Sequence, residues 1–87
     1  HPESVLGIVR AALEELGKAK KARVRLNPFD MPGVLSHREE LQRAIHGIES
    51  IELVTDPNLE GGCVVESESG VIDASVSTIV QLLEDAA

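Results

Sequence analysis

Residues 61–75 of this 87-residue chain read GGCVVESESGVIDAS, and this stretch decides the fold. Two runs suited to β-strands, Cys63 to Glu68 and Val71 to Ala74, are separated only by Ser69-Gly70, a dipeptide typical of tight turns. The preceding Gly61-Gly62 indicates a turn or a bulge where the first run begins. The stretch therefore predicts a β-hairpin.

Two further strands are predicted before the hairpin. Residues 22–26 alternate between apolar and basic side chains, and residues 51–55 form a second β-rich run that ends at Asp56-Pro57-Asn58. One face of the sheet is expected to carry Ala22, Val24, Leu26, Ile51, Leu53, Cys63, Val65 and Ile72. The other is expected to carry Arg23, Arg25, Glu52, Glu66, Glu68 and Asp73. Opposite charges on neighbouring strands pair for about 0.2–1 kcal/mol each, so this polar face is expected to satisfy itself rather than to form a pocket.

The segment between the first two strands carries two sets of helix signals. Asn27 suits an N-cap and Pro28 the first helical position, after which Pro32-Gly33 is expected to break the pattern. Ser36 with Glu39 then forms a capping-box signature. The helix that follows would carry Leu41, Ile45 and Ile48 and end near Gly47. Either one kinked helix or a short turn followed by a helix satisfies these signals.

Two more helices are predicted near the ends of the sequence. Apolar residues between Val5 and Leu16 recur over a stripe about 160° wide, so this helix should pack against the domain. The last helix is capped by Asp73 or Ser75. In it, Val76, Ile79, Val80 and Leu83 are expected to form a buried stripe, and Leu82, about 60° beyond the stripe, is expected to protrude. These five residues are the candidate partner-binding site.

The predicted order is helix, strand, helix, three strands, helix, which indicates an α+β fold with a small mixed four-stranded sheet. Eighty-seven residues support one domain with a modest core, so residues 1–87 are interpreted as a single domain. Because the first helix starts almost at residue 1, we expect this domain to be a fragment of a longer chain.

Composition narrows the functional classes. No apolar run approaches the roughly 20 residues of a membrane helix, and no signal-peptide pattern is present, which favours a cytosolic setting. The lone Cys63 excludes an internal disulfide and fits a reducing compartment. Phe29 is the only aromatic residue, so a stacking platform for single-stranded nucleic acid is poorly supported.

The residues offer no catalytic or metal-binding constellation. The three histidines and one cysteine lack the spacings of zinc sites, and His37 and His46 are expected to face solvent. Cys63 begins an apolar strand and resembles a small buried hydrophobe rather than a nucleophile. The Gly61-Gly62 pair precedes a strand and lacks the lysine of a phosphate-binding loop. We therefore expect no catalytic residue, no metal and no cofactor.

Charge is distributed unevenly along the chain. The part up to Arg43 holds eight basic and six acidic residues, whereas residues 44–87 hold nine acidic residues and no basic one, giving net charges of +2 and −9. The acidic half repels nucleic acid and anionic membranes. Lys18, Lys20, Lys21, Arg23 and Arg25 form one basic segment. A small nucleic-acid-binding domain that uses this segment is the alternative function, although outward-facing strand residues and helix-end cations account for all five positions.

Three stretches of the sequence resemble the C-terminal domain of the FliH/YscL family of stator proteins. They are RVRLNPFD at residues 23–30, IELVTDPNL at residues 51–59 and the hairpin stretch at residues 61–75. The resemblance covers about Ala22 to Leu83 and implies a fold similar to the C-terminal domain of the peripheral-stalk protein of rotary ATPases. The long helical region expected before this domain is missing from the sequence.

The resemblance also implies a function. Proteins of this family act as peripheral stalks in type III secretion systems and flagellar export, where they dimerise, bind and restrain the export ATPase, and connect it to the cytoplasmic sorting platform or C-ring. It follows that this domain would contact the ATPase in the cytoplasm, at the periphery of the inner-membrane export apparatus. Contacts with a second copy and with the sorting platform would involve the missing helical region. Neither nucleic-acid binding nor membrane insertion is implied.

Overall fold

The hairpin predicted at residues 61–75 is present in the computed structural model, which describes residues 5–86. Strand β3 (Gly62–Ser67) and strand β4 (Gly70–Ser75) pair antiparallel, from Gly62 opposite Ser75 to Ser67 opposite Gly70. Strand β1 (Lys21–Leu26) lies antiparallel to β3 on its other side. Strand β2 (Ser50–Thr55) pairs parallel to β1, so the order is β2-β1-β3-β4 and the sheet is mixed. The predicted α+β class is confirmed.

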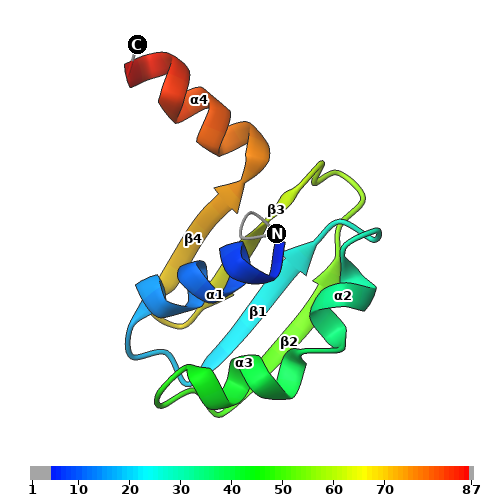
Figure 1. Ribbon diagram of the computed structural model, residues 1–87. Helices are drawn as coiled ribbons and strands as arrows, with labels where there is room; N and C mark the ends of the chain where they lie inside the picture. The colour runs from blue at the N-terminus through cyan, green and yellow to red at the C-terminus, as the bar shows by residue number, and fades with distance from the viewer. Residues whose placement is uncertain (1–4, 87) are drawn as a thin grey trace.

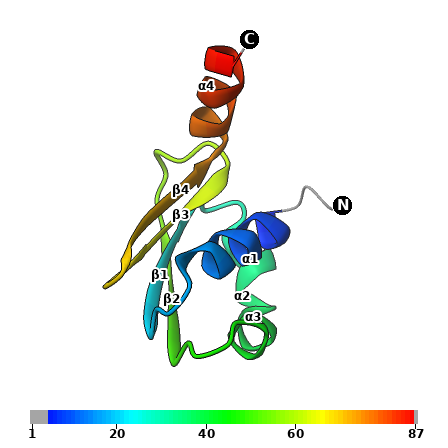
Figure 2. The same cartoon turned by 90° about the vertical axis from the view of Figure 1, so that its left-hand side faces the viewer.

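Three helices cover one face of this sheet and leave the other face open (Figure 2). Helix α1 (Val5–Leu16) packs on β3 and β4, while α2 (Met31–Leu35) and α3 (Arg38–Ala44) lie over β2. The parallel pairing of β1 with β2 requires a crossover connection, which α2 and α3 provide. Helix α4 (Val76–Ala86) continues from β4 and projects beyond the end of the sheet (Figure 1).

The core lies between the sheet and these three helices. Strand β1 alternates exposed and buried residues along its whole length, as its sequence predicts. The apolar strand residues expected on one face are either buried or, for Leu53 and Ile72, partly buried against the core. From the helices, the core is completed by Val9, Ala12, Leu13, Val34 and Leu41.

The segment between β1 and β2 differs from the prediction in several ways. The N-cap of α2 is Asp30 rather than Asn27, and the proline in its first turn is Pro32 rather than Pro28. Pro32-Gly33 does not break the helix but lies inside α2, because a proline in the first helical turn removes an N–H that has no intrahelical partner anyway. Ser36 does not cap the second helix from its N-terminal side; it is the C-cap of α2, and its hydroxyl donates to the Gly33 carbonyl at 2.9 Å. The segment therefore forms two short helices. The second ends at Ala44, so Ile45 and Ile48 enter the loop.

Candidate interaction surfaces

The junction between β4 and α4 is held by a network of hydrogen bonds. The Ser75 backbone N–H donates to Asp73 Oδ1 at 3.0 Å, and Thr78 Oγ1 donates to Asp73 Oδ2 at 3.0 Å. The Thr78 backbone N–H donates to Ser75 Oγ at 3.3 Å, which is the N-cap bond of α4. Hydrogen bonds from Ser75 and Thr78 hold the pKa of Asp73 below its usual value. Both predicted capping residues therefore act together.

Two glycines pack against this junction. Gly62 has a φ of +75°, and a Cβ there would overlap the Ala74 carbonyl oxygen and lie 3.0 Å from Ser75 Cα. The Val76 backbone N–H donates to the Gly61 carbonyl at 3.1 Å, which extends the hairpin ladder into the start of α4. Only glycine satisfies both the left-handed backbone and the close approach at residue 62. These contacts hold the first residue of α4 in a defined position relative to β3 and β4.

Helix α4 exposes its apolar residues instead of burying them. The prediction that Val76, Ile79, Val80 and Leu83 form a buried stripe is wrong, because the helix contacts chiefly β4 and runs past the sheet. The five candidate partner-binding residues, Val76, Ile79, Val80, Leu82 and Leu83, are between 40% and 67% exposed. They occupy one face of the helix when 100° is taken per residue. The five candidate residues therefore form an apolar face that is open to solvent.

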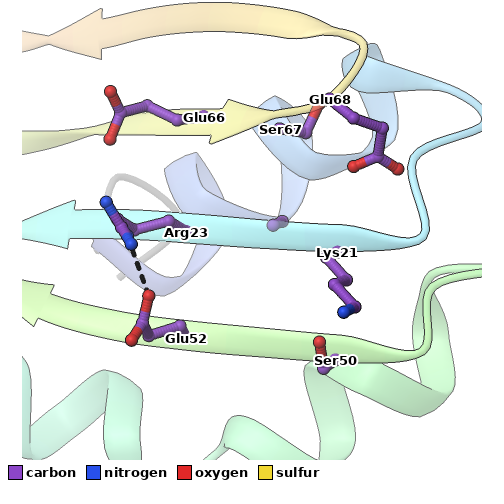
Figure 3. A pocket seen from close by; sticks show the side chains of 8 residues that line it. Lys21, Arg23, Ser50, Glu52, Glu66, Ser67 and Glu68 are labelled. Atoms are coloured by element: carbon purple, nitrogen blue, oxygen red, sulfur yellow. Dashed lines mark hydrogen bonds and ion pairs between the residues drawn. The ribbon is translucent and has the colours of Figure 1, made fainter.

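The uncovered face of the sheet is polar, and its charges are paired across strands. Arg23 Nε donates to Glu52 Oε1 at 2.8 Å (Figure 3), a contact that raises the pKa of Arg23. Arg25 Nε lies 3.6 Å from Glu66 Oε1. These pairs span β1–β2 and β1–β3, as predicted. The face forms an open, shallow depression bordered by charged and hydroxyl groups rather than an enclosed pocket. Exposed pairs of this kind contribute about 0–1 kcal/mol each to stability.

The basic segment is divided by these contacts. Its two arginines are engaged by carboxylates, whereas within residues 5–86 no ion pair forms on the side chains of Lys18, Lys20 and Lys21. The Lys20 backbone N–H donates to Glu68 Oε1 at 2.6 Å and holds the pKa of that carboxyl below its usual range. The three lysines therefore lie at the end of the sheet that carries the β3–β4 turn.

Within residues 5–86, neither Cys63 nor the two histidines belong to a cluster that could hold a metal ion. Burial, followed by the nearby Asp73 charge, raises the pKa of the Cys63 thiol to about 11, so it stays protonated at neutral pH. Among the described residues, no three His, Cys, Asp or Glu side chains are grouped to hold a metal ion. His37 and His46 are exposed, as expected.

One exposed residue was not singled out as a site from the sequence. Phe29, in the turn between β1 and α2, is 94% exposed and borders a shallow groove with Val5, Leu6 and Val34. Its amide donates to Asn27 Oδ1 at 2.8 Å, a side-chain turn that directs the chain outward before α2. The sequence contains a signal for this exposure. An aromatic residue directly after Asn-Pro lies in a turn, and turn residues seldom reach the core.

Comparison with known proteins fits this architecture. The family model described as "Flagellar assembly protein FliH" matches residues 1–83. The chain belongs to the FliH family. It is 32% identical over 82 residues to a protein of Yersinia pestis named "Type 3 secretion system stator protein", a match that covers 93% of this chain and 37% of that protein. A "Flagellar assembly protein FliH" of Borreliella burgdorferi is 29% identical over 82 residues, covering 93% of this chain and 27% of that protein.

The similarity extends to a second stator relative. The "Type 3 secretion system stator protein" of Yersinia enterocolitica is 31% identical over 85 residues, which are 97% of this chain and 38% of that protein. The chain therefore spans little more than a third of the length of the stator proteins it matches. No helix within residues 5–86 has the combination of length and hydrophobicity that a bilayer crossing requires.

Proposed function

We propose that this chain is the ATPase-binding domain of a stator in a type III secretion or flagellar export apparatus. The exposed apolar face of α4, formed by Val76, Ile79, Val80, Leu82 and Leu83, is the contact surface. The observation that carries the proposal is the exposure of this face in a family whose relatives are named stators. An amphipathic helix that leaves its apolar face open has that face available for a partner.

We also propose a wider role, which membership of the FliH family supports. The domain is the C-terminal globular part of a longer stator chain, restrains the ATPase, and works in the cytoplasm beside the inner-membrane export apparatus. A helical stalk outside this sequence carries much of the contact between two copies and the link to the sorting platform or C-ring. The domain is a binding module rather than an enzyme, which the names of the family and of its stator relatives support. Its single thiol is buried and protonated at neutral pH, so that thiol is not available as a nucleophile.

Binding of the cognate export ATPase to the full-length stator tests this proposal. Burying one leucine side chain contributes about 1.5–3 kcal/mol, and tenfold in affinity corresponds to about 1.4 kcal/mol. We therefore expect Leu82→Glu to weaken binding at least roughly tenfold. Its thermal unfolding should stay close to wild type, because surface substitutions usually change stability by less than about 0.5 kcal/mol.

Leu35→Glu is the matched control. Leu35 is an exposed leucine on α2, away from α4, and the change adds the same charge. Equal loss of binding in both variants, or no binding by the wild-type stator at low and physiological salt, would overturn the proposal. A large loss of thermal stability in Leu82→Glu would show that Leu82 belongs to the folded core instead.

A further inference from the structure

The two edges of the sheet are treated differently. At β2, Arg38 Nε donates to the Ile51 carbonyl at 2.9 Å and Gln42 Nε2 donates to the Glu49 carbonyl at 2.7 Å, so side chains of α3 occupy outward-facing backbone groups. Edge strands are commonly protected in such ways, because unpaired backbone groups recruit further strands. Strand β4 forms the other edge of the sheet.

The hydrogen-bond parity of the hairpin shows which groups of β4 are open. The Val76 N–H bonds to the Gly61 carbonyl, so alternate residues back along β4 bond to β3 in the same way. Val71 and Asp73 lie between them and direct their backbone N–H and C=O groups away from β3. Within residues 5–86, no strand or side chain pairs with these groups. The Asp73 carboxylate binds the outward Ser75 N–H and the Thr78 hydroxyl at the α4 end of β4, and it leaves the backbone groups of Val71 and Asp73 open.

We propose that β4 pairs antiparallel with β4 of a second copy of this chain, about a two-fold axis at Ile72. In this arrangement Val71 of each copy lies opposite Asp73 of the other. Each such pair exchanges two backbone hydrogen bonds, and the two four-stranded sheets become one continuous sheet. The edge of β4 is therefore complementary to the same edge of a second copy.

Charge favours a second copy as the occupant. Antiparallel pairing brings the start of α4 beside the β3–β4 turn of the other copy, because that turn lies at the opposite end of β4. Figure 1 shows α4 running from the end of β4 toward the side of the unpaired edge. The Lys20 amide bonds Glu68 in that turn, so Lys18, Lys20 and Lys21 lie at the same end of the sheet. The ammonium groups that form no ion pair within the described chain therefore face the acidic α4 of the other copy.

The length of α4 matches the distance from β4 to the lysine cluster of the other copy. From β4 to β1 of the other copy there are three strand spacings, about 14 Å at about 4.8 Å each. Glu84 lies nine residues into α4, about 13 Å along a helix that rises 1.5 Å per residue. Glu84 and Asp85 therefore reach the lysine cluster. Both acids lie off the apolar face of α4, so that face stays available to the ATPase and the self-association is independent of the proposed function.

The molar mass of the 87-residue chain in solution, measured by sedimentation equilibrium up to millimolar concentration, tests the pairing. We expect the mass to rise from 9.3 kDa toward twice that value, with association weakening as salt increases. Val71→Pro removes an outward amide and should weaken association at least tenfold. Thr55→Pro is the matched control, because it removes an outward amide from the β2 edge and should leave association unchanged. Circular dichroism confirms that each variant is folded.

Charge-reversal variants provide a second test, which leaves the backbone hydrogen bonds unchanged. Glu84→Lys with Asp85→Lys, and separately Lys18→Glu with Lys21→Glu, should each weaken self-association at least tenfold. Mixing these two variants should restore a dimer, since both contacts across the two-fold axis are then between opposite charges. A wild-type mass that stays at 9.3 kDa, equal effects of the two proline variants, or no gain on mixing would each overturn the proposal.

Discussion

Replacing Gly62 with alanine probes the joint from which α4 projects. The residue has a φ of +75°, and its added Cβ would overlap the Ala74 carbonyl oxygen and lie 3.1 Å from the Val76 nitrogen. A left-handed backbone costs a non-glycine residue roughly 1–2 kcal/mol. Forcing atoms into a closely packed region costs a further 1–3 kcal/mol or so. We therefore expect Gly62→Ala to lower the free energy of unfolding by about 2–5 kcal/mol, or Tm by about 10 °C or more for a domain of this size.

Two other glycines separate strain from overlap. Gly47 has a φ of +87° with no atom within 4 Å of an added Cβ, so Gly47→Ala should show the backbone strain alone, roughly 1–2 kcal/mol. Gly33 lies inside α2 with an ordinary φ and open space around it, so Gly33→Ala should be neutral or stabilising by up to about 1 kcal/mol.

Urea unfolding of the three variants, followed by circular dichroism, gives these free energies. A Gly62→Ala variant no less stable than Gly47→Ala would refute the close approach between Gly62 and the β4–α4 junction. A variant as stable as wild type would refute the left-handed conformation as well. The expected order, with Gly62→Ala lowest and Gly33→Ala highest, would show that both effects act at the joint.

Two further predictions concern titrating groups. Because burial raises the pKa of Cys63 to about 11, its thiol should react with a disulfide reagent at neutral pH only at the rate of unfolding; rapid reaction of the folded chain would contradict the burial. The pKa of Asp73 is lower in the folded chain than its ordinary value of 3.8, so its stabilising contribution is complete above about pH 4 and is lost as pH falls through the folded pKa. Asp73→Asn should therefore flatten the acid side of the stability curve below about pH 4, and an unchanged acid limb would contradict the capping bonds.

The sequence predicted the strands well because each carries its own local signal. Residues 22–26 alternate strictly, and Ser69-Gly70 can only join neighbouring strands closely, so strand β1 and the pairing of β3 with β4 follow from short-range patterns. The pairing of β1 with β3 joins distant parts of the chain and does not. The paired charges of Arg23 and Glu52 were likewise predictable from the side that each residue faces. The fold class and the polar face therefore required no tertiary information.

The predictions for α4 and Ser36 were wrong because the same local sequence pattern is compatible with two different tertiary arrangements. The stripe of Val76, Ile79 and Leu83 has the same periodicity whether it packs on its own sheet or awaits another surface, and only the direction of the β4–α4 joint decides between them. Ser36 can cap either neighbouring helix, and its hydroxyl bonds backward to Gly33 instead of forward. The open edge of β4 also depends on strand order, which periodicity does not contain.

The central claim is that the exposed face of α4 binds the export ATPase. Methyl NMR spectra of the 87-residue chain, recorded while the cognate ATPase is added, test it most directly. We predict that the methyl signals of Val76, Ile79, Val80, Leu82 and Leu83 change first and most. The methyls of Val24 and Val65, which are fully buried beneath the helices, should change little. Changes centred on the open sheet face or around Phe29, with the α4 methyls unaffected, would contradict the account.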